Sequence, residues 1–215
     1  MAWNDLMRRL SQALPGPAVW LRVVTIVPDT KDWTWVLQRP CPECGLDTQS
    51  FPREAIAGMV RVNAAAWLGV LAGPGDVRRR PAPEVWSALE YGCHVCDVLW
   101  LYDERLRLML MLEAPRYPNW DQDATAVADR YAEQDPAVVA AGLREAADVI
   151  AERFEGLSSD QWQRTGSRSD GAQFTVESFA RYFIHDPIHH LYDVTGARHD
   201  RRPTGAQYDR RPTGG

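Results

Sequence analysis

The sequence predicts an all-α protein built as a four-helix bundle. Four long segments place apolar residues at the spacing of an amphipathic helix, and runs rich in proline and glycine separate them. Between these segments no two stretches alternate convincingly as paired strands would. The length of 215 residues suits one domain with a sizeable core. The predicted helices are residues 52–71, 84–112, 136–154 and 175–194.

The first two helices are bounded by residues that cannot continue them. Residues 52–71 end at the Gly-Pro-Gly run at 73–75. The second helix, residues 84–112, follows Pro83, which suits the first turn of a helix. A short helix is expected over residues 123–132 before the third long one begins.

The last two helices have recognisable ends. The third starts near Pro136, and Gly156 is its expected C-cap. Thr175 is a good N-cap for the fourth helix. Pro187 lies inside that helix, where it removes one backbone hydrogen bond and clashes with the preceding turn, so we expect a kink there.

The helical body is expected to cover residues 28–195, with an appendage at each end. Residues 1–27 form an irregular N-terminal extension, broken by Pro-Gly-Pro, and the sequence leaves open whether this extension belongs to the natural protein. Residues 196–215 contain Asp-Arg-Arg-Pro-Thr-Gly twice. Two short copies are too few for a repeat fold, so we expect a flexible, low-complexity tail.

Composition excludes several classes of partner. The net charge of −5 gives no electrostatic footprint for nucleic acid. No window approaches the roughly 18 apolar residues of a membrane span. The N-terminus lacks the basic and apolar regions of a signal peptide. We therefore expect a cytoplasmic protein with reduced cysteines and a small-molecule substrate.

Three histidines suggest a metal site. His185 and His189 are four apart, so both imidazoles project from one face of the fourth helix, and His94 lies on the second helix. Three imidazoles leave at least one coordination position open, which suits a divalent metal: zinc first, nickel or iron as alternatives. His190 is rotated about 100° from His189, so we expect it to point elsewhere, as an outer or structural residue.

Carboxylates near these histidines could orient the imidazole rings. The candidates are Glu90, Asp97, Asp186 and Asp193. Glu90 lies four residues before His94, whereas di-iron bundles place Glu three before His, which argues against a di-iron centre.

The helical face around His94 is polar near that residue and apolar toward Leu112, and Arg105 also lies on it. A polar patch at one end of an inward face suits a pocket, although a partly solvated face gives the same pattern.

Four cysteines occur as two Cys-x-x-Cys pairs. Cys41 and Cys44 precede a glycine, as in a zinc-knuckle turn, and Cys93 and Cys96 lie on the second helix away from His94. A four-cysteine zinc site would require the knuckle to fold onto that helix face. A knuckle without metal is the simpler interpretation, and redox chemistry usually needs a thioredoxin-like context that is missing here.

Several local segments resemble actinobacterial proteins of the DinB/YfiT-like superfamily. They are Asp32-Trp-Thr-Trp-Val, Arg39-Pro-Cys-Pro-Glu-Cys-Gly, Glu90-Tyr-Gly-Cys-His-Val, Pro118-Asn-Trp-Asp-Gln-Asp and Arg181-Tyr-Phe-Ile-His-Asp-Pro-Ile-His-His-Leu. The resemblance covers about residues 28–195. It implies a DinB/YfiT-like four-helix bundle in which His94, His185 and His189 bind a divalent metal, and homodimers are common among relatives.

The resemblance also implies a reaction. Better-understood relatives are metal-dependent thiol S-transferases and a maleylpyruvate isomerase that use low-molecular-weight thiols such as mycothiol or bacillithiol. We therefore expect a transferase that joins such a thiol to a small electrophile. Arg181 is a candidate to bind an anionic group, and Tyr182 or Asp121 to transfer a proton. A metal-dependent hydrolase and a non-enzymatic, metal-stabilised binding protein are the alternatives.

Overall fold

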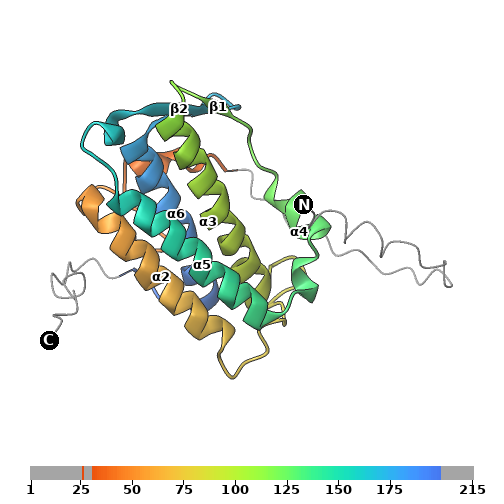
Figure 1. The fold of residues 1–215 in the computed structure, drawn as a ribbon. Coiled ribbons are helices and arrows are strands. Elements are labelled where there is room, and N and C mark those ends of the chain that lie inside the picture. The colour runs from red at the N-terminus through yellow and green to blue at the C-terminus, as the bar shows by residue number, and fades with distance from the viewer. Residues whose placement is uncertain (1–25, 27–30, 200–215) are drawn as a thin grey trace, which may run out of the picture.

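A computed structural model describes residue 26 and residues 31–199. Its body consists of four long helices, α2 (Ile56–Leu71), α3 (Ala88–Met111), α5 (Pro136–Glu155) and α6 (Val176–Thr195). Helices α5 and α6 each pack against both α2 and α3, so the order around the bundle is α2, α5, α3, α6 (Figure 1). The predicted four-helix body is confirmed, with helix bounds close to those expected.

Short elements connect the long helices. They are η1 (Trp33–Leu37), η2 (Arg53–Ala55), α4 (Gln122–Ala128), η3 (Tyr131–Glu133) and η4 (Gln161–Gln163). The short helix expected over residues 123–132 therefore corresponds to α4 followed by η3.

A small sheet closes one end of the bundle, which corrects the expectation of an all-α body without strand pairing (Figure 1). Strand β2 (Thr165–Arg168) pairs antiparallel with β3 (Gln173–Thr175) and parallel with β1 (Arg116–Tyr117). The turn between β2 and β3 contains Gly171 at φ +101°, a conformation that favours glycine. The hairpin is as polar as a loop, and its strands are too short to show an alternation of apolar and polar residues in the sequence.

The N-terminus of α3 is fixed more tightly than the sequence suggested. The helix begins at Ala88 rather than 84, because Ser87 and Glu90 form a reciprocal capping box. Arg80 in the preceding loop binds the carboxylate of Glu90, which is almost fully buried. Glu90 is thus committed to holding the start of α3 and is not a ring-orienting partner of His94.

Helix α6 runs continuously through Pro187. Thr175 is its N-cap, as predicted, and Gly196 ends it at φ +68°. The carbonyl of Pro187 accepts hydrogen bonds from Asn63 Nδ2 at 3.0 Å and Trp67 Nε1 at 3.2 Å, both on α2. These two donors fix the depth and rotation of α6 beside its histidines.

Helix α2 and the residues before it are apolar. The segment Arg53–Leu71 is long and apolar enough to cross a membrane by length and composition alone, which corrects the expectation that no window approaches a membrane span. In the structure this helix packs against α5 and α6, and Ile56, Val60 and Trp67 are buried. A core helix of a bundle has the same character.

The predicted terminal segments lie largely outside the described residues. Of the extension at residues 1–27, only Ile26 is described, and of the tail at residues 196–215, only the first four residues are. Those four residues return toward the cysteine turn, because the backbone N–H of His199 donates to the carbonyl of Cys44 at 2.7 Å.

Removing the Asn63 amide should weaken the bundle. We expect Asn63→Ala to lower the free energy of unfolding by about 1–2 kcal/mol, because a buried hydrogen bond to Pro187 is lost and a small void remains. Urea denaturation followed by circular dichroism measures this difference. Val62→Ala, at an exposed position of the same helix, is the control and should change stability by less than about 0.5 kcal/mol.

Candidate functional site

His94 lies on α3 and is completely buried. Its ring stacks on Trp120 with centroids 5.3 Å apart and an interplanar angle of 10°, and the ring of Trp86 is also 5.3 Å away. Neither ring nitrogen makes a hydrogen bond within the described part of the chain. A buried imidazole without a hydrogen bond is costly, so a bound ion would satisfy an atom that the fold leaves unsatisfied.

Asp186 and His190, four residues apart on α6, face His94. Oδ1 of Asp186 lies 3.4 Å from Nε2 of His94 and 3.8 Å from Nε2 of His190. Each of the three residues offers one potential ligand atom, and these three atoms lie within 4.8 Å of one another. Asp193 lies 2.9 Å from Nδ1 of His190, which leaves Nε2 of His190 directed at the group.

The protonation states suit a divalent metal. Burial lowers the pKa of His94, so its imidazole is neutral near neutral pH, as a ligand must be. Burial alone would raise the pKa of Asp186, but His190 and His94 outweigh it and lower that pKa to about 2. Oδ1 of Asp186 is buried without a hydrogen bond. Two imidazoles and one carboxylate, with unsatisfied atoms on His94 and Asp186, form a donor set that fits such an ion.

His185 and His189 belong to a different group. Their ligand atoms lie within 4.8 Å of those of Cys41 and Cys44, and all four side chains are buried. The expected set of His94, His185 and His189 is therefore not brought to one point but divided between two groups.

The pitch of the helix explains this division. Residues 186 and 190 are rotated about 100° from residues 185 and 189, so the two pairs face different neighbours. His190 does point in another direction than His189, but that direction is toward His94, and their ring centroids are 4.8 Å apart.

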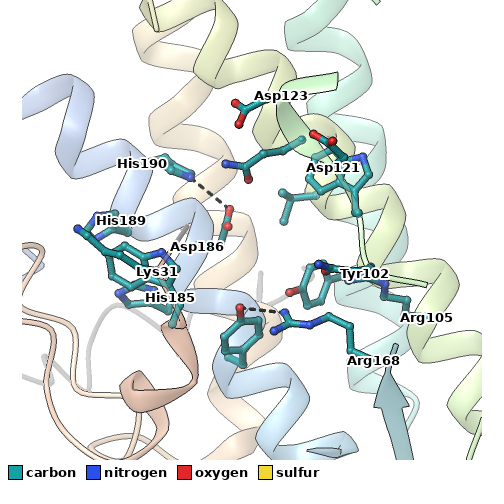
Figure 2. Close-up of a pocket in the computed structure, with 16 residues that line it drawn as sticks. Lys31, Tyr102, Arg105, Asp121, Asp123, Arg168, His185, Asp186, His189 and His190 are labelled. Carbon is teal, nitrogen blue, oxygen red and sulfur yellow. Dashed lines mark hydrogen bonds and ion pairs between the residues drawn. The ribbon is translucent and has the colours of Figure 1, made fainter. Parts of the chain in front are cut away.

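A pocket of about 450 Å³ opens beside Asp186 and His190 (Figure 2). Its wall combines aromatic and charged side chains from α3, α4, α6 and the segment around η1. The lining residues include Lys31, Trp33, Val98, Trp120, Asp121, Asp123, His185 and His189. An ion at the His94 group would therefore adjoin a space large enough for a small molecule.

Two arginines lie at the end of this pocket away from Asp123 (Figure 2). Arg105 is buried, and its guanidinium lies 5.0 Å from the ring centroid of Tyr117. Arg168 donates to the hydroxyl of Tyr182 at 3.2 Å and to Asp170 at 2.8 Å. The two guanidiniums form a positively charged end suited to a carboxylate or phosphate group.

The three predicted catalytic residues have different positions. Tyr182 and Asp121 line the pocket, and Asp121 also caps α4 by accepting from the backbone N–H of Ala124. Arg181 does not line it: its guanidinium binds Glu177 and the carbonyls of the loop before η2. Arg181 is thus occupied in attaching this loop to α6, whereas Arg105 and Arg168 line the pocket.

Sequence reasoning missed several residues of the site. The sequence predicts Asp186 only as an orienting carboxylate, although Asp186 and His190 have the same i, i+4 spacing as the histidine pair. Arg105 was noted on the face of His94, which was a usable signal. Arg168 lies in the hairpin of β2 and β3, which was not predicted, so no signal in the sequence pointed to this residue. Asp97, a candidate to orient the ring of His94, accepts from the hydroxyl of Tyr131.

Fold and site together define a helical bundle with a candidate metal centre between its helices. The chain belongs to the DinB superfamily, whose sequence profile matches residues 59–194, more than half of the chain. This confirms the resemblance found in the sequence.

A solved structure supports the fold. The chain is similar to YfiT from Bacillus subtilis, described as a probable metal-dependent hydrolase with an unusual four-helix bundle topology. The two share 16% sequence identity with a TM-score of 0.63, over 76% of this chain and 94% of that one. At this identity the likeness shows the fold alone. No functionally curated protein is detectably similar to this chain in sequence.

Metal-free protein should lose stability on acidification. Burial lowers the pKa of His185 to about 4 from its ordinary 6.5, and the pKa values of His94 and His189 are also lowered, first by burial. The unfolded chain takes up protons near 6.5 while these imidazoles stay neutral in the fold, so stability present above about pH 6.5 is lost as pH falls toward 4. The melting temperature of chelator-treated protein should fall across this window, and a constant value would contradict neutral buried histidines.

Proposed function

We propose that this protein is a metal-dependent enzyme that transfers a low-molecular-weight thiol, of the mycothiol type, onto a small anionic electrophile. One observation carries the proposal: His94, Asp186 and His190 converge beside a pocket whose other end holds Arg105 and Arg168. Metal ligands and an anion-binding end in one pocket suit chemistry on a charged small molecule.

His94, Asp186 and His190 would hold the ion. A divalent metal there would lower the pKa of a bound thiol or water and so supply a nucleophile near neutral pH. Asp193 keeps Nε2 of His190 directed at the ion by binding Nδ1. Trp120 stacks against His94 and shields that side of the group from water.

Arg105 and Arg168 would orient the substrate by its anionic group. Burial raises the pKa of Tyr102 and of Tyr182, so both phenols stay protonated near neutral pH and can donate hydrogen bonds into the pocket. Proton transfer by Tyr182 or Asp121 remains part of this proposal, because both line the same space.

The pocket has room for a small-molecule ligand. Its volume of about 450 Å³ lies within the roughly 300–1,000 Å³ that is usual for ligand pockets. Lys31 and Asp123 give the lining toward α4 and η1 a polar character that suits the hydrophilic body of a low-molecular-weight thiol.

Hydrolysis is the second candidate. Two histidines with one carboxylate form the donor set of several zinc hydrolases, in which the ion activates water. The description of Bacillus subtilis YfiT as a probable metal-dependent hydrolase points in the same direction.

A requirement for thiol separates the two reactions. Metal-loaded protein is offered small electrophiles that bear a carboxylate, with and without mycothiol, and small anionic esters and amides without thiol. Consumption of the electrophile only with thiol supports the transferase, and turnover of esters or amides without thiol supports the hydrolase. Equal rates for wild type and His94→Ala would contradict both.

The ligand assignment makes a prediction about metal content. We expect His190→Ala and Asp186→Asn each to lose one equivalent of bound metal and at least about 100-fold in turnover, because each removes one of only three protein ligands. Elemental analysis beside an activity assay measures both. Full metal content in both variants would exclude this ligand set.

The two arginines at the end of the pocket, Arg105 and Arg168, lead to another prediction. Arg168→Gln should raise KM for an anionic substrate by about 10- to 100-fold with little change for a neutral analogue, because a charged hydrogen bond of roughly 1.5–3 kcal/mol is lost. Arg107→Gln, an exposed position on α3, is the matched control and should leave KM unchanged. An equal loss for neutral and anionic substrates would mean that Arg168 has a structural role only.

A further inference from the structure

We propose that Cys41, Cys44, His185 and His189 form a second metal site, a closed Cys2His2 zinc site that attaches the segment around η1 to α6. This site is separate from the His94 group and does not depend on the proposed reaction. Four protein ligands leave no position for substrate, which is the arrangement of structural zinc.

The cysteine turn has the conformation of a zinc knuckle. The backbone N–H of Gly45 donates to the carbonyl of Cys41 at 3.0 Å, and that of Cys41 donates to the carbonyl of Leu46 at 2.8 Å. Gly45 has φ +83°, which favours glycine at the position after the second cysteine. Both thiols are free and fully buried, so the turn presents two sulfurs to the interior.

The four ligand atoms are close enough to share one ion. Sγ of Cys41 lies 3.7 Å from Nδ1 of His189. Tetrahedral zinc with ordinary bond lengths separates a sulfur and a nitrogen ligand by roughly 3.6 Å. All four ligand atoms lie within 4.8 Å of one another, so small side-chain rotations suffice to bind the ion.

Burial and charge favour an ion over an empty group. All four side chains are buried, and Nε2 of His185 has no hydrogen-bond partner in the described part of the chain. Zinc would bind the two cysteines as thiolates with release of two protons to solvent, which leaves a neutral complex. A neutral, fully ligated ion avoids both an unpaired buried charge and an unsatisfied nitrogen.

The surroundings of His189 match those of a metal ligand. Its Nδ1 faces Cys41, while its Nε2 lies 3.5 Å from Glu43 and 3.7 Å from Asp193. Imidazole ligands usually bind a carboxylate through the second nitrogen, which fixes the ring and its tautomer. Asp193 also contacts His190, so one carboxylate adjoins both metal groups.

The zinc would hold one wall of the pocket in place. Trp33 packs on both histidines, with ring centroids 5.4 Å from His185 and 4.8 Å from His189, and it lines the pocket together with Lys31. Loss of the ion should therefore loosen η1 and the knuckle before it affects the helical bundle.

Cobalt substitution of the whole chain tests the site. Cobalt bound by cysteine thiolates gives a sulfur-to-metal charge-transfer absorption in the near ultraviolet, which the His94 group cannot give because it has no sulfur. We expect wild type to show this absorption, and Cys41→Ser and Cys44→Ser to lose it. Cys96→Ser, in the pair on α3, is the matched control and should keep it.

A second measurement uses wild-type protein and so does not depend on whether the cysteine variants fold. In wild-type protein, zinc should protect two of the four cysteines from a thiol-reactive dye, and a chelator should expose them. The His94→Ala variant should keep both the absorption and the protection while losing the other equivalent of metal, so the two metal proposals fail separately.

Cobalt binding without thiolate absorption in wild type would overturn the site. So would equal reactivity of the cysteines toward the dye in wild-type protein with zinc and after treatment with a chelator.

Discussion

Helix α6 turns by about 100° per residue, and the chemistry of the protein depends on this rotation. It directs residues 185 and 189 toward the cysteine turn and residues 186 and 190 toward His94. One and a half turns thus supply ligands to two groups. The carbonyl of Pro187, held by Asn63 and Trp67, fixes the rotation at the residue between the pairs. A slip of one residue in α6 would move one pair into the place of the other and so disrupt both groups.

An apolar bundle can accommodate so many polar groups because each has a counterpart nearby. Burial lowers the pKa values of His94, His185 and His189, and His190 and His94 lower the pKa of Asp186. Arg105 is packed against the rings of Tyr102 and Tyr117 and donates to the carbonyl of Pro118. The atoms left unsatisfied in the described part of the chain concentrate at His94, His185 and Asp186, where metal binding is proposed.

The helices were predictable because their limits are encoded locally, as with Thr175 before α6 and Gly156 after α5. The importance of His94 and of the His185-to-His190 stretch was also visible. The choice between two overlapping i, i+4 pairs was not, because spacing cannot tell which side of a helix meets which neighbour. The pairing of Cys41 with His189 spans 148 residues, and the hairpin with Arg168 lacks strand periodicity, so only the fold brings these residues to the site.

Each group has an indole of its own. Trp120 stacks on His94, whereas Trp33 lies against His185 and His189. Emission from an indole in contact with an imidazole is quenched when that imidazole binds a paramagnetic ion such as Cu²⁺. One variant would keep Trp120 and the other would keep Trp33 as the tryptophan near the two groups. Fluorescence of the first variant reports metal binding at the His94 group, and fluorescence of the second reports metal binding at the cysteine group. The aromatic packing that shields the histidines from water therefore also makes the order of metal loading observable when the two variants are compared.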